Sequence, residues 1–171
     1  MLHALQIAIV LVFPVLVVTG GLRDLVSYII PNWISLALVG AFFPAALALG
    51  IPLGEIGVHA AIGAGCLVLG MVMFALRWIG GGDAKLLAAS ALWMGWPALG
   101  PFGLYTGLAG GGLALTLLYL RSARVRPLVL VGPAWLTRLA SPGEGTPYGV
   151  AIAIGALFAF PVSTLSAALG S

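Results

Sequence analysis

The chain has 171 residues, of which 62% are hydrophobic and only 6% are charged. Soluble globular domains carry about 25% charged residues, so this composition excludes an ordinary soluble protein and predicts an all-α integral membrane protein. The single cysteine excludes an internal disulfide framework and a cysteine-rich zinc site. Membrane topology explains the net charge of +3 better than nucleic-acid binding does.

Six apolar segments are long enough to predict membrane-spanning helices, because about 20 residues cross a bilayer. In chain order they cover about Ala4–Leu22, Trp33–Gly50, Ile56–Ile79, Ala84–Leu99, Phe102–Leu120 and Tyr148–Leu169. The fourth segment is short, and a tight turn is expected between Pro97 and Pro101. No repeat or linker divides the chain, so residues 1–171 are predicted to form one membrane domain.

The connection between the fifth and sixth segments contains a shorter apolar stretch, Leu128–Leu139. This stretch is too short to span a membrane and contains Gly132 and Pro133. It is therefore predicted to be an interfacial or re-entrant segment, followed by a flexible loop. The beginning of the chain lacks a basic region and a clear small-residue cleavage site, so a cleaved signal peptide is not expected.

The charges divide between the two sides that six spans create. The loops after the first, third and fifth segments hold every basic residue of the chain: Arg23, Arg77, Lys85, Arg121, Arg124, Arg126 and Arg138. The positive-inside rule places these loops in the cytoplasm and both termini outside. The same three loops hold Asp24, Asp83 and Glu144, whereas Glu55 lies on the other side. Two aspartates from different loops are therefore predicted to meet one membrane face.

Asp24 and Asp83 have both a chemical and a structural interpretation. Two neighbouring carboxyl groups cannot both ionise cheaply, so one keeps a proton while the other accepts one. Such a pair can activate a water and protonate a leaving amine, as aspartic peptide hydrolysis requires. Structurally, Gly80–Gly82 can end the third helix and Asp83 can N-cap the fourth. Asp24 can equally be a polar residue at a helix exit, before the turn at Pro31-Asn32.

Two motifs carry a resemblance to a known family. The first is Asp24 seven residues before Pro31-Asn32, and the second is Gly80, Gly82 and Asp83 in a Gly-x-Gly-Asp pattern with Lys85 two residues later. In this order they resemble the motifs of the type IV prepilin peptidase family. The stretch Pro147–Leu157 is also similar to the entry of the family's last span. The Gly-x-Gly-Asp motif alone is less specific, because presenilin-like peptidases also have it.

The resemblance implies an intramembrane aspartic endopeptidase with Asp24 and Asp83 as the catalytic pair. It implies that the enzyme cuts the short basic leader from a prepilin or pseudopilin at the cytoplasmic membrane face, just after a glycine. No metal and no organic cofactor is expected, and neither is nucleic acid. The resemblance also implies that Gly80 and Gly82 shape the substrate's approach. Three further residues would support the catalytic pair: Lys85, Asn32 and Pro31.

The chain also departs from parts of the family. Its one cysteine, Cys66, excludes the paired CxxC motifs of the larger bifunctional members. The resemblance therefore implies the short peptidase-only form, similar to those serving Flp (tight adherence) pili, without an N-terminal methyltransferase region. Many short members have basic residues between the first aspartate and the proline, where this chain reads LVSYII.

Other residues and other functions stay open at this point. Glu144 is the rival acid, although its glycine- and proline-rich surroundings indicate a solvated loop. Glu55 and His59 are spaced i, i+4 and are interpreted as an outer interfacial pair, because a metal site would need more ligands. The alternatives to a peptidase are a small proton-coupled transporter, because buried acids serve proton relays, and a non-catalytic subunit of a pilus or secretion machine.

Overall fold

The computed structural model describes residues 2–141 and 143–170, and every regular element within them is helical. The elements are α1 (Leu2–Ser27), α2 (Asn32–Ala48), α3 (Leu53–Ala75), α4 (Gly81–Leu120), α5 (Arg126–Val129), α6 (Ala134–Leu139), α7 (Tyr148–Ala159), the short 3-10 helix η1 (Phe160–Val162) and α8 (Thr164–Leu169). The predicted all-α fold is confirmed.

Prolines and glycines set where the main helices begin. Pro31, Pro52 and Pro147 stand directly before α2, α3 and α7. A proline has no N–H to donate to a preceding helical turn, so it separates one helix from the next. Gly80 takes the corresponding position before α4. The sequence thus divides its apolar content into helices at defined residues.

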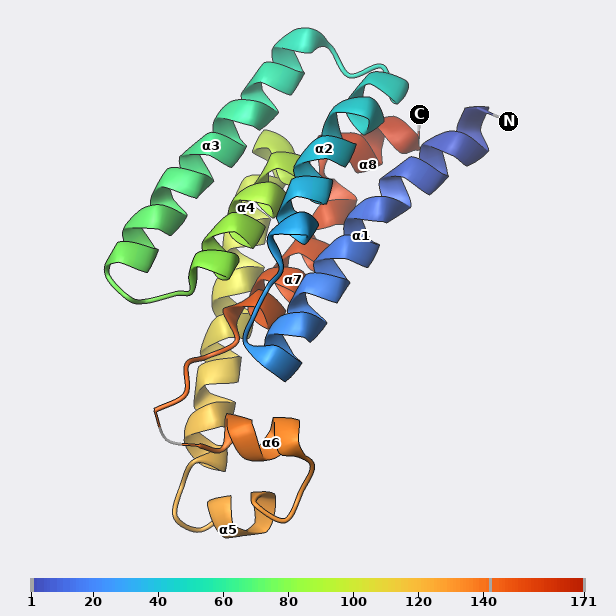
Figure 1. Ribbon diagram of the computed structural model, residues 1–171. Coiled ribbons are helices and arrows are strands. Elements are labelled where there is room, and N and C mark those ends of the chain that lie inside the picture. The colour runs from blue at the N-terminus through green and yellow to red at the C-terminus, as the bar shows by residue number, and fades with distance from the viewer. Residues whose placement is uncertain (1, 142, 171) are drawn as a thin grey trace.

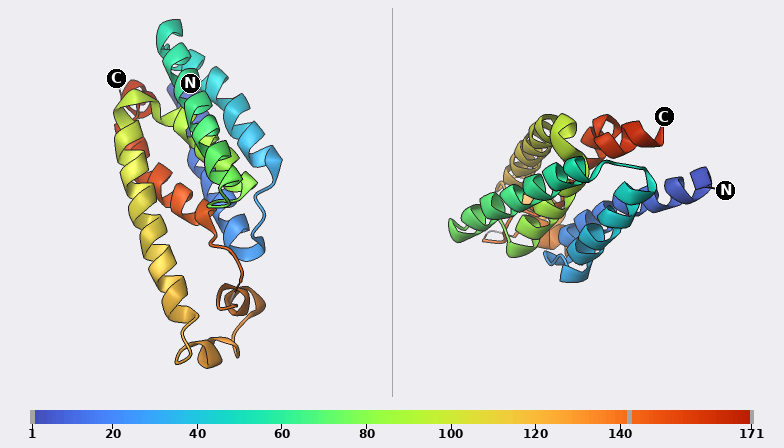
Figure 2. Two further views of the ribbon diagram at one scale, coloured as in Figure 1. Left: turned by 90° about the vertical axis from the view of Figure 1, so that its left-hand side faces the viewer. Right: turned by 90° about the horizontal axis from the view of Figure 1, so that it is seen from above.

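α4 consists of two helices joined at Gly95. This residue has φ 64° and ψ −174°, a conformation that is strained for any residue with a side chain. A Cβ here would also lie only 2.5 Å from Cε1 of His59. The chain reverses at this point, so residues 81–94 and 96–120 run in opposite directions along the bundle (Figure 2). The turn predicted between Pro97 and Pro101 is therefore misplaced, and both prolines lie inside the second helix.

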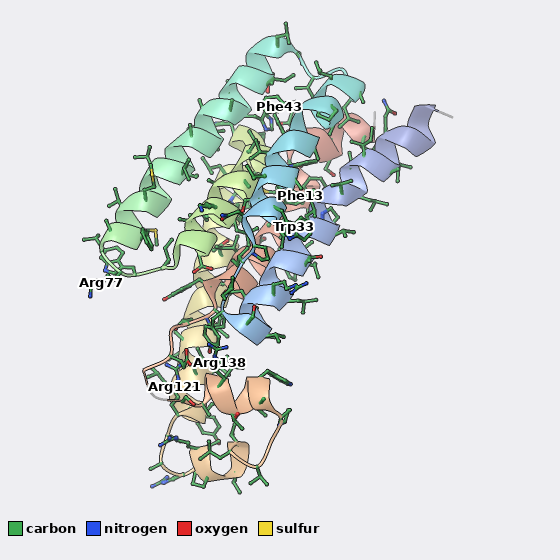
Figure 3. The ribbon with its side chains drawn as sticks, viewed as in Figure 1. Phe13, Trp33, Phe43, Arg77, Arg121 and Arg138 are labelled. Carbon is green, nitrogen blue, oxygen red and sulfur yellow. The ribbon has the colours of Figure 1, made fainter. Side chains whose placement is uncertain are left out.

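The helices form an elongated bundle whose connections alternate between its two ends (Figure 1). The connections 28–31, 76–80 and 121–147 all lie at the end that carries α5 and α6. These are the three connections predicted to share one side. Figure 3 shows Arg77, Arg121 and Arg138 toward this same end. Met1 and Ser171, which the prediction placed on the opposite side, lie outside the described residues.

The first half of α4 lies in the core, where its Trp93 contacts α1 and α2. α4 packs against α3 and α7, and α1 packs against α2 and α7. Phe13 stacks on Trp93 with ring centroids 5.1 Å apart, and Phe42 meets Trp93 edge-on at 5.9 Å. The Trp93 indole N–H donates a hydrogen bond to the Leu38 carbonyl at 2.9 Å. Because this buried polar atom is satisfied, the aromatic cluster holds α1, α2 and α4 in one arrangement.

The outer surface of the bundle is apolar. Large hydrophobic side chains are exposed on several helices, among them Leu11, Val15, Leu36, Val68 and Leu108. Within the described residues, three helical segments are long and apolar enough to cross a membrane: 6–27, 53–75 and 81–120. Two shorter apolar helical segments cover 32–48 and 148–162. These features are consistent with a membrane protein, and the count of six spans stays a prediction.

Several predicted boundaries are corrected. The first predicted segment, which was to end at Leu22, continues as helix to Ser27. The third was to end at Ile79 but ends at Ala75, and Arg77 then takes a left-handed φ of 61°. The predicted stretch Leu128–Leu139 forms no single spanning helix, as expected. It holds most of the two short helices α5 and α6, which lie beyond the end of the bundle (Figure 1).

Candidate active site

Asp24 lies in the last turn of α1 and is only 4% exposed. The prediction placed it in a loop, but the residues after it continue the helix, and the Tyr28 N–H still donates to the Asp24 carbonyl at 2.9 Å. The Asp24 carboxylate accepts a hydrogen bond of 2.7 Å from the backbone N–H of Gly149, near the start of α7. This carboxylate is therefore held by a helix 125 residues further along the chain.

Asp83 is the third residue of α4 and is 6% exposed. It was predicted to lie in a loop and to N-cap the fourth helix, but Gly80 is the N-cap and Asp83 is already helical. The Asp83 carboxylate reaches back and accepts a hydrogen bond of 2.9 Å from the Gly80 N–H. This bond satisfies one of the backbone donors that a helix start leaves unpaired. The glycines therefore begin α4, and they do not end α3 as predicted.

The structure brings Asp24 and Asp83 together. The two carboxyl groups are close enough for their charges to interact, and the Gly149 N–H donates to Asp24. Both line a cavity of about 180 Å³, whose other lining residues are Tyr28, Ile29, Ile30, Gly80, Gly81 and Gly82. At about 30 Å³ for each water, this cavity has room for about six waters. Several waters therefore fit beside the two carboxyl groups. We call this space the aspartate pocket.

Glycine backbone forms one side of the aspartate pocket. A Cβ at Gly82 would lie 3.0 Å from Cβ of Ile30, and a Cβ at Gly80 would lie 3.0 Å from the Asp83 carboxylate. A side chain at either position would displace a neighbour that shapes the pocket. The absence of side chains at the two glycines thus keeps Ile30 and the Asp83 carboxylate in place, and their role in the approach of a substrate stays a prediction.

Gly149 is a residue of this site that the sequence did not single out. A Cβ here would lie 2.9 Å from both Cβ and a carboxylate oxygen of Asp24. α7 can thus donate its N–H to Asp24 only because residue 149 has no side chain. The sequence offered one weak signal, the stretch beginning at Pro147, which was interpreted only as the entry of the last span.

Lys85 and Asn32 contact each other beside the aspartate pocket. The Lys85 ammonium donates a hydrogen bond to the Asn32 side-chain carbonyl at 2.9 Å, which ties the start of α4 to the start of α2. Pro31 contributes as the N-cap of α2. Lys85 and Asn32 are both exposed. Their hydrogen bond links two helices, and neither residue contacts an aspartate among the contacts described.

A larger cavity of about 480 Å³ begins at Lys85 and Asn32. α4 supplies its floor, while α2 and α3 supply its walls, and most of the lining is apolar: Leu36, Val39, Phe43, Ala60, Gly63, Ala64, Leu67, Ala88, Ala89 and Leu92. Ser35 also lines it, with a buried hydroxyl that makes no hydrogen bond within the described part of the chain. We call this cavity the α2–α3 groove.

The other candidate residues lie elsewhere. Glu144 is not among the residues that line the aspartate pocket, and it forms an ion pair of 3.3 Å with Arg138. The predicted outer pair of Glu55 and His59 is wrong. His59 is 1% exposed, and its Nδ1 donates a hydrogen bond to the Leu92 carbonyl at 2.7 Å, whereas Glu55 is exposed. The i, i+4 spacing did not reveal that His59 is turned inward, toward the reversal of α4.

A model of the type IV leader peptidase family matches residues 11–115. This match covers more than half of the chain and includes both aspartates, the glycine motif and Lys85. The chain belongs to the type IV leader peptidase family. No curated protein and no solved structure matches it. Membership of the leader peptidase family indicates that the protein is a peptidase and supports prepilin processing in general terms. Gly149 and the connection 121–147 lie outside the matched residues.

Proposed function

We propose that this leader peptidase is an intramembrane aspartic endopeptidase that removes the short basic leader from Flp-type prepilins. The observation that carries the proposal is the meeting of Asp24 and Asp83 in one pocket, from helices far apart in the sequence. The family supports the peptidase activity, and the paired carboxyl groups support the aspartic mechanism.

The geometry supports a general acid–base reaction. Two adjacent buried carboxyl groups share one proton, because two negative charges at this separation are costly. The ionised carboxylate takes a proton from a water as the water oxygen attacks the peptide carbonyl carbon. The protonated carboxyl group then supplies a proton to the departing nitrogen as the C–N bond breaks. The products are the leader with a new carboxylate and the mature chain with a new amino terminus.

The Gly149 N–H gives the two carboxyl groups different surroundings. It donates to Asp24 at 2.7 Å, whereas one oxygen of Asp83 accepts from Gly80 and the other makes no hydrogen bond among the described residues. A hydrogen bond to a carboxylate stabilises its ionised form. Both groups receive such a bond, so these hydrogen bonds do not single out one of them as the base.

The α2–α3 groove supports a membrane-inserted substrate. It begins two residues beyond Ile30 and Asp83, which line the aspartate pocket, and it continues along the apolar part of α4. Small side chains at Ala60, Gly63 and Ala88 allow another helix to approach closely. We assign the groove to the apolar segment of the prepilin that follows the cut bond, with the basic leader held at the pocket end.

The same arrangement supports a cytoplasmic active site in the bacterial inner membrane. Six predicted spans put three connections on one side of the membrane: 28–31, 76–80 and 121–147. The basic residues fall on this side, so the positive-inside rule assigns it to the cytoplasm. The aspartate pocket opens at this end of the bundle, where a leader that stays in the cytoplasm can reach it.

Leader cleavage in membranes tests the proposal. The chain is co-expressed with a Flp-type prepilin, and the loss of the leader is followed as a decrease in prepilin size. We expect cleavage by the parent, and at least about a hundredfold slower cleavage with either Asp24→Asn or Asp83→Asn, since a general acid or base contributes about 10²–10⁴ in rate. Membrane abundance is measured for each variant to show that it still folds.

Glu144→Gln provides the matched control, because Glu144 is an acid at the same end of the bundle but outside the aspartate pocket. We expect this variant to cleave at the parent rate. If cleavage survives the loss of either aspartate carboxyl group in an abundant protein, the aspartic mechanism is wrong. If Glu144→Gln alone abolishes cleavage, the acid has been misassigned.

A further inference from the structure

Tyr28 lines the aspartate pocket directly after the end of α1. It lies four residues after Asp24, so one helical turn separates it from the carboxyl group. The family motifs do not include this position, and the resemblance assigned it no role. The pocket nevertheless has one aromatic ring among its lining residues, and that ring belongs to Tyr28.

The backbone at Tyr28 is strained. Its φ is +56°, in the left-handed region that glycine occupies most easily. A glycine is the usual residue directly after a helix end in this conformation, so a bulky residue here needs another reason. Strained residues of this kind concentrate at binding and active sites, where the surrounding structure holds them in place. The position of Tyr28 in the pocket provides such a reason.

The Tyr28 ring contacts the connection 121–147 through Arg138. The Arg138 guanidinium lies over its face, 5.2 Å from the ring centroid, a separation at which a cation is attracted to the ring. Arg121 fixes the connection that carries Arg138, by donating hydrogen bonds of 2.9 Å to the carbonyls of Leu139 and Gly145. Tyr28 therefore stands between the pocket, which it lines, and the connection 121–147, which its ring contacts.

The phenol hydroxyl lies near charged residues of the connection 121–147, Arg121 among them. Its oxygen is buried and makes no hydrogen bond to another described residue. Burial raises the pKa of the Tyr28 phenol above its ordinary value, so the side chain stays neutral at physiological pH. Tyr28 therefore lines the pocket as a neutral residue.

We propose that Tyr28 determines which residue the peptidase accepts directly before the cut bond. The inference rests on the proposed function. The pocket holds only about 180 Å³, and its lining residues include both aspartates, three glycines and Tyr28. An attacking water and a peptide group fill most of this space, so a side chain on the residue before the cut would meet the ring. A glycine at that position avoids the contact.

The test is a specificity measurement with matched substrates. Three prepilin peptides that span the leader junction carry glycine, alanine or valine before the cut bond. Cleavage rates are measured with the parent and with Tyr28→Gly and Tyr28→Phe in detergent or vesicles. One added methyl group in a tight pocket changes rates by about 10- to 200-fold. We expect the parent to prefer glycine over alanine by at least about tenfold, and Tyr28→Gly to reduce this preference to less than about threefold.

Two control variants separate the ring from the backbone. Tyr28→Phe keeps the ring and lacks only the unbonded hydroxyl, so it should keep the parent preference. Arg77→Gly relieves the same strain directly after α3, where φ is +61°, but Arg77 is not among the residues that line the pocket. It should therefore leave the preference unchanged. An unaltered glycine preference in Tyr28→Gly, or a lost one in Arg77→Gly, overturns the inference.

A binding measurement decides the inference even where no peptide is cleaved. The same three peptides are titrated against Asp83→Asn, with Tyr28 present or changed to glycine. The expected result is a glycine preference in Kd that disappears with the ring. Equal affinities for all three peptides in the presence of Tyr28, or no binding of any, overturn the role of Tyr28. Failure of the parent to cleave a peptide that it binds selectively would contradict the proposed function alone.

Discussion

Gly149→Ala tests whether α7 takes part in the active site. The added Cβ would lie 2.9 Å from Cβ of Asp24, whereas carbon atoms pack best at about 3.5–4.0 Å. Asp24 and α7 must therefore separate by at least about 0.6 Å. The hydrogen bond from the Gly149 N–H, now 2.7 Å, would lengthen to about 3.3 Å, past the usual limit of about 3.2 Å for this type of bond.

The expected cost follows from the strength of that bond. A hydrogen bond to a charged group contributes about 1.5–3 kcal/mol, and about 1.4 kcal/mol corresponds to tenfold in rate. We therefore expect kcat/KM for leader cleavage to fall by about 10- to 100-fold. Alanine favours helix over glycine by about 1 kcal/mol, so helix propensity opposes any loss of folding. The assay is initial-rate cleavage of a prepilin peptide by purified protein, with thermal unfolding measured in parallel.

Gly111→Ala is the matched control for this prediction. Gly111 is also helical, and a Cβ there would have no atom within 4 Å. It should leave cleavage unchanged. If Gly149→Ala retains a kcat/KM within about threefold of the parent while Gly111→Ala behaves as expected, the contact between α7 and Asp24 has no role in catalysis, and the reasoning from its geometry is refuted.

Two further predictions concern the supports of the site. Gly95→Ala would place a side chain at a left-handed φ, with its Cβ 2.5 Å from His59, so we expect the protein to lose at least about 2 kcal/mol of stability. The control is Gly112→Ala, where nothing lies within 4 Å of the added Cβ. Gly95→Ala should unfold at a lower temperature than this control, and equal unfolding temperatures would contradict the prediction. Lys85→Met removes one exposed hydrogen bond to Asn32, and a bond of this kind contributes about 0.5–1.5 kcal/mol. Cleavage of the prepilin should therefore slow by less than about tenfold. A complete loss of cleavage would instead indicate that Lys85 has a direct catalytic role.

The composition and the motif spacing were enough to predict the helical fold and the two aspartates that meet. Long apolar segments have few alternatives to helix in a membrane, and the alternation of the predicted segments placed three connections at one end, where the structure has them. Asp24 and Asp83 could be paired because their loops fell on the same predicted side. That inference needed only the parity of the spans, and not the exact end of any helix.

Contacts between distant helices could not be predicted in the same way. The Gly149 N–H reaches Asp24 across 125 residues of sequence, and no periodicity encodes which helix packs against which. His59 was misassigned for a related reason: its neighbours on the helix indicated an exposed face, while its actual partner, the Leu92 carbonyl, comes from α4. The reversal was placed at prolines because they are strong helix breakers, although Gly95 is the residue with the required φ.

The bond between Gly149 and Asp24 also has a consequence for the timing of synthesis. Chains are made from the N-terminus, and their first segments fold before the last are available. Asp24 and Asp83 are synthesised early, but the N–H that holds Asp24 is present only when α7 has been made. A nascent or truncated chain therefore contains both acids and lacks their fixed arrangement. Synthesis of α7 is therefore the step that completes the surroundings of Asp24.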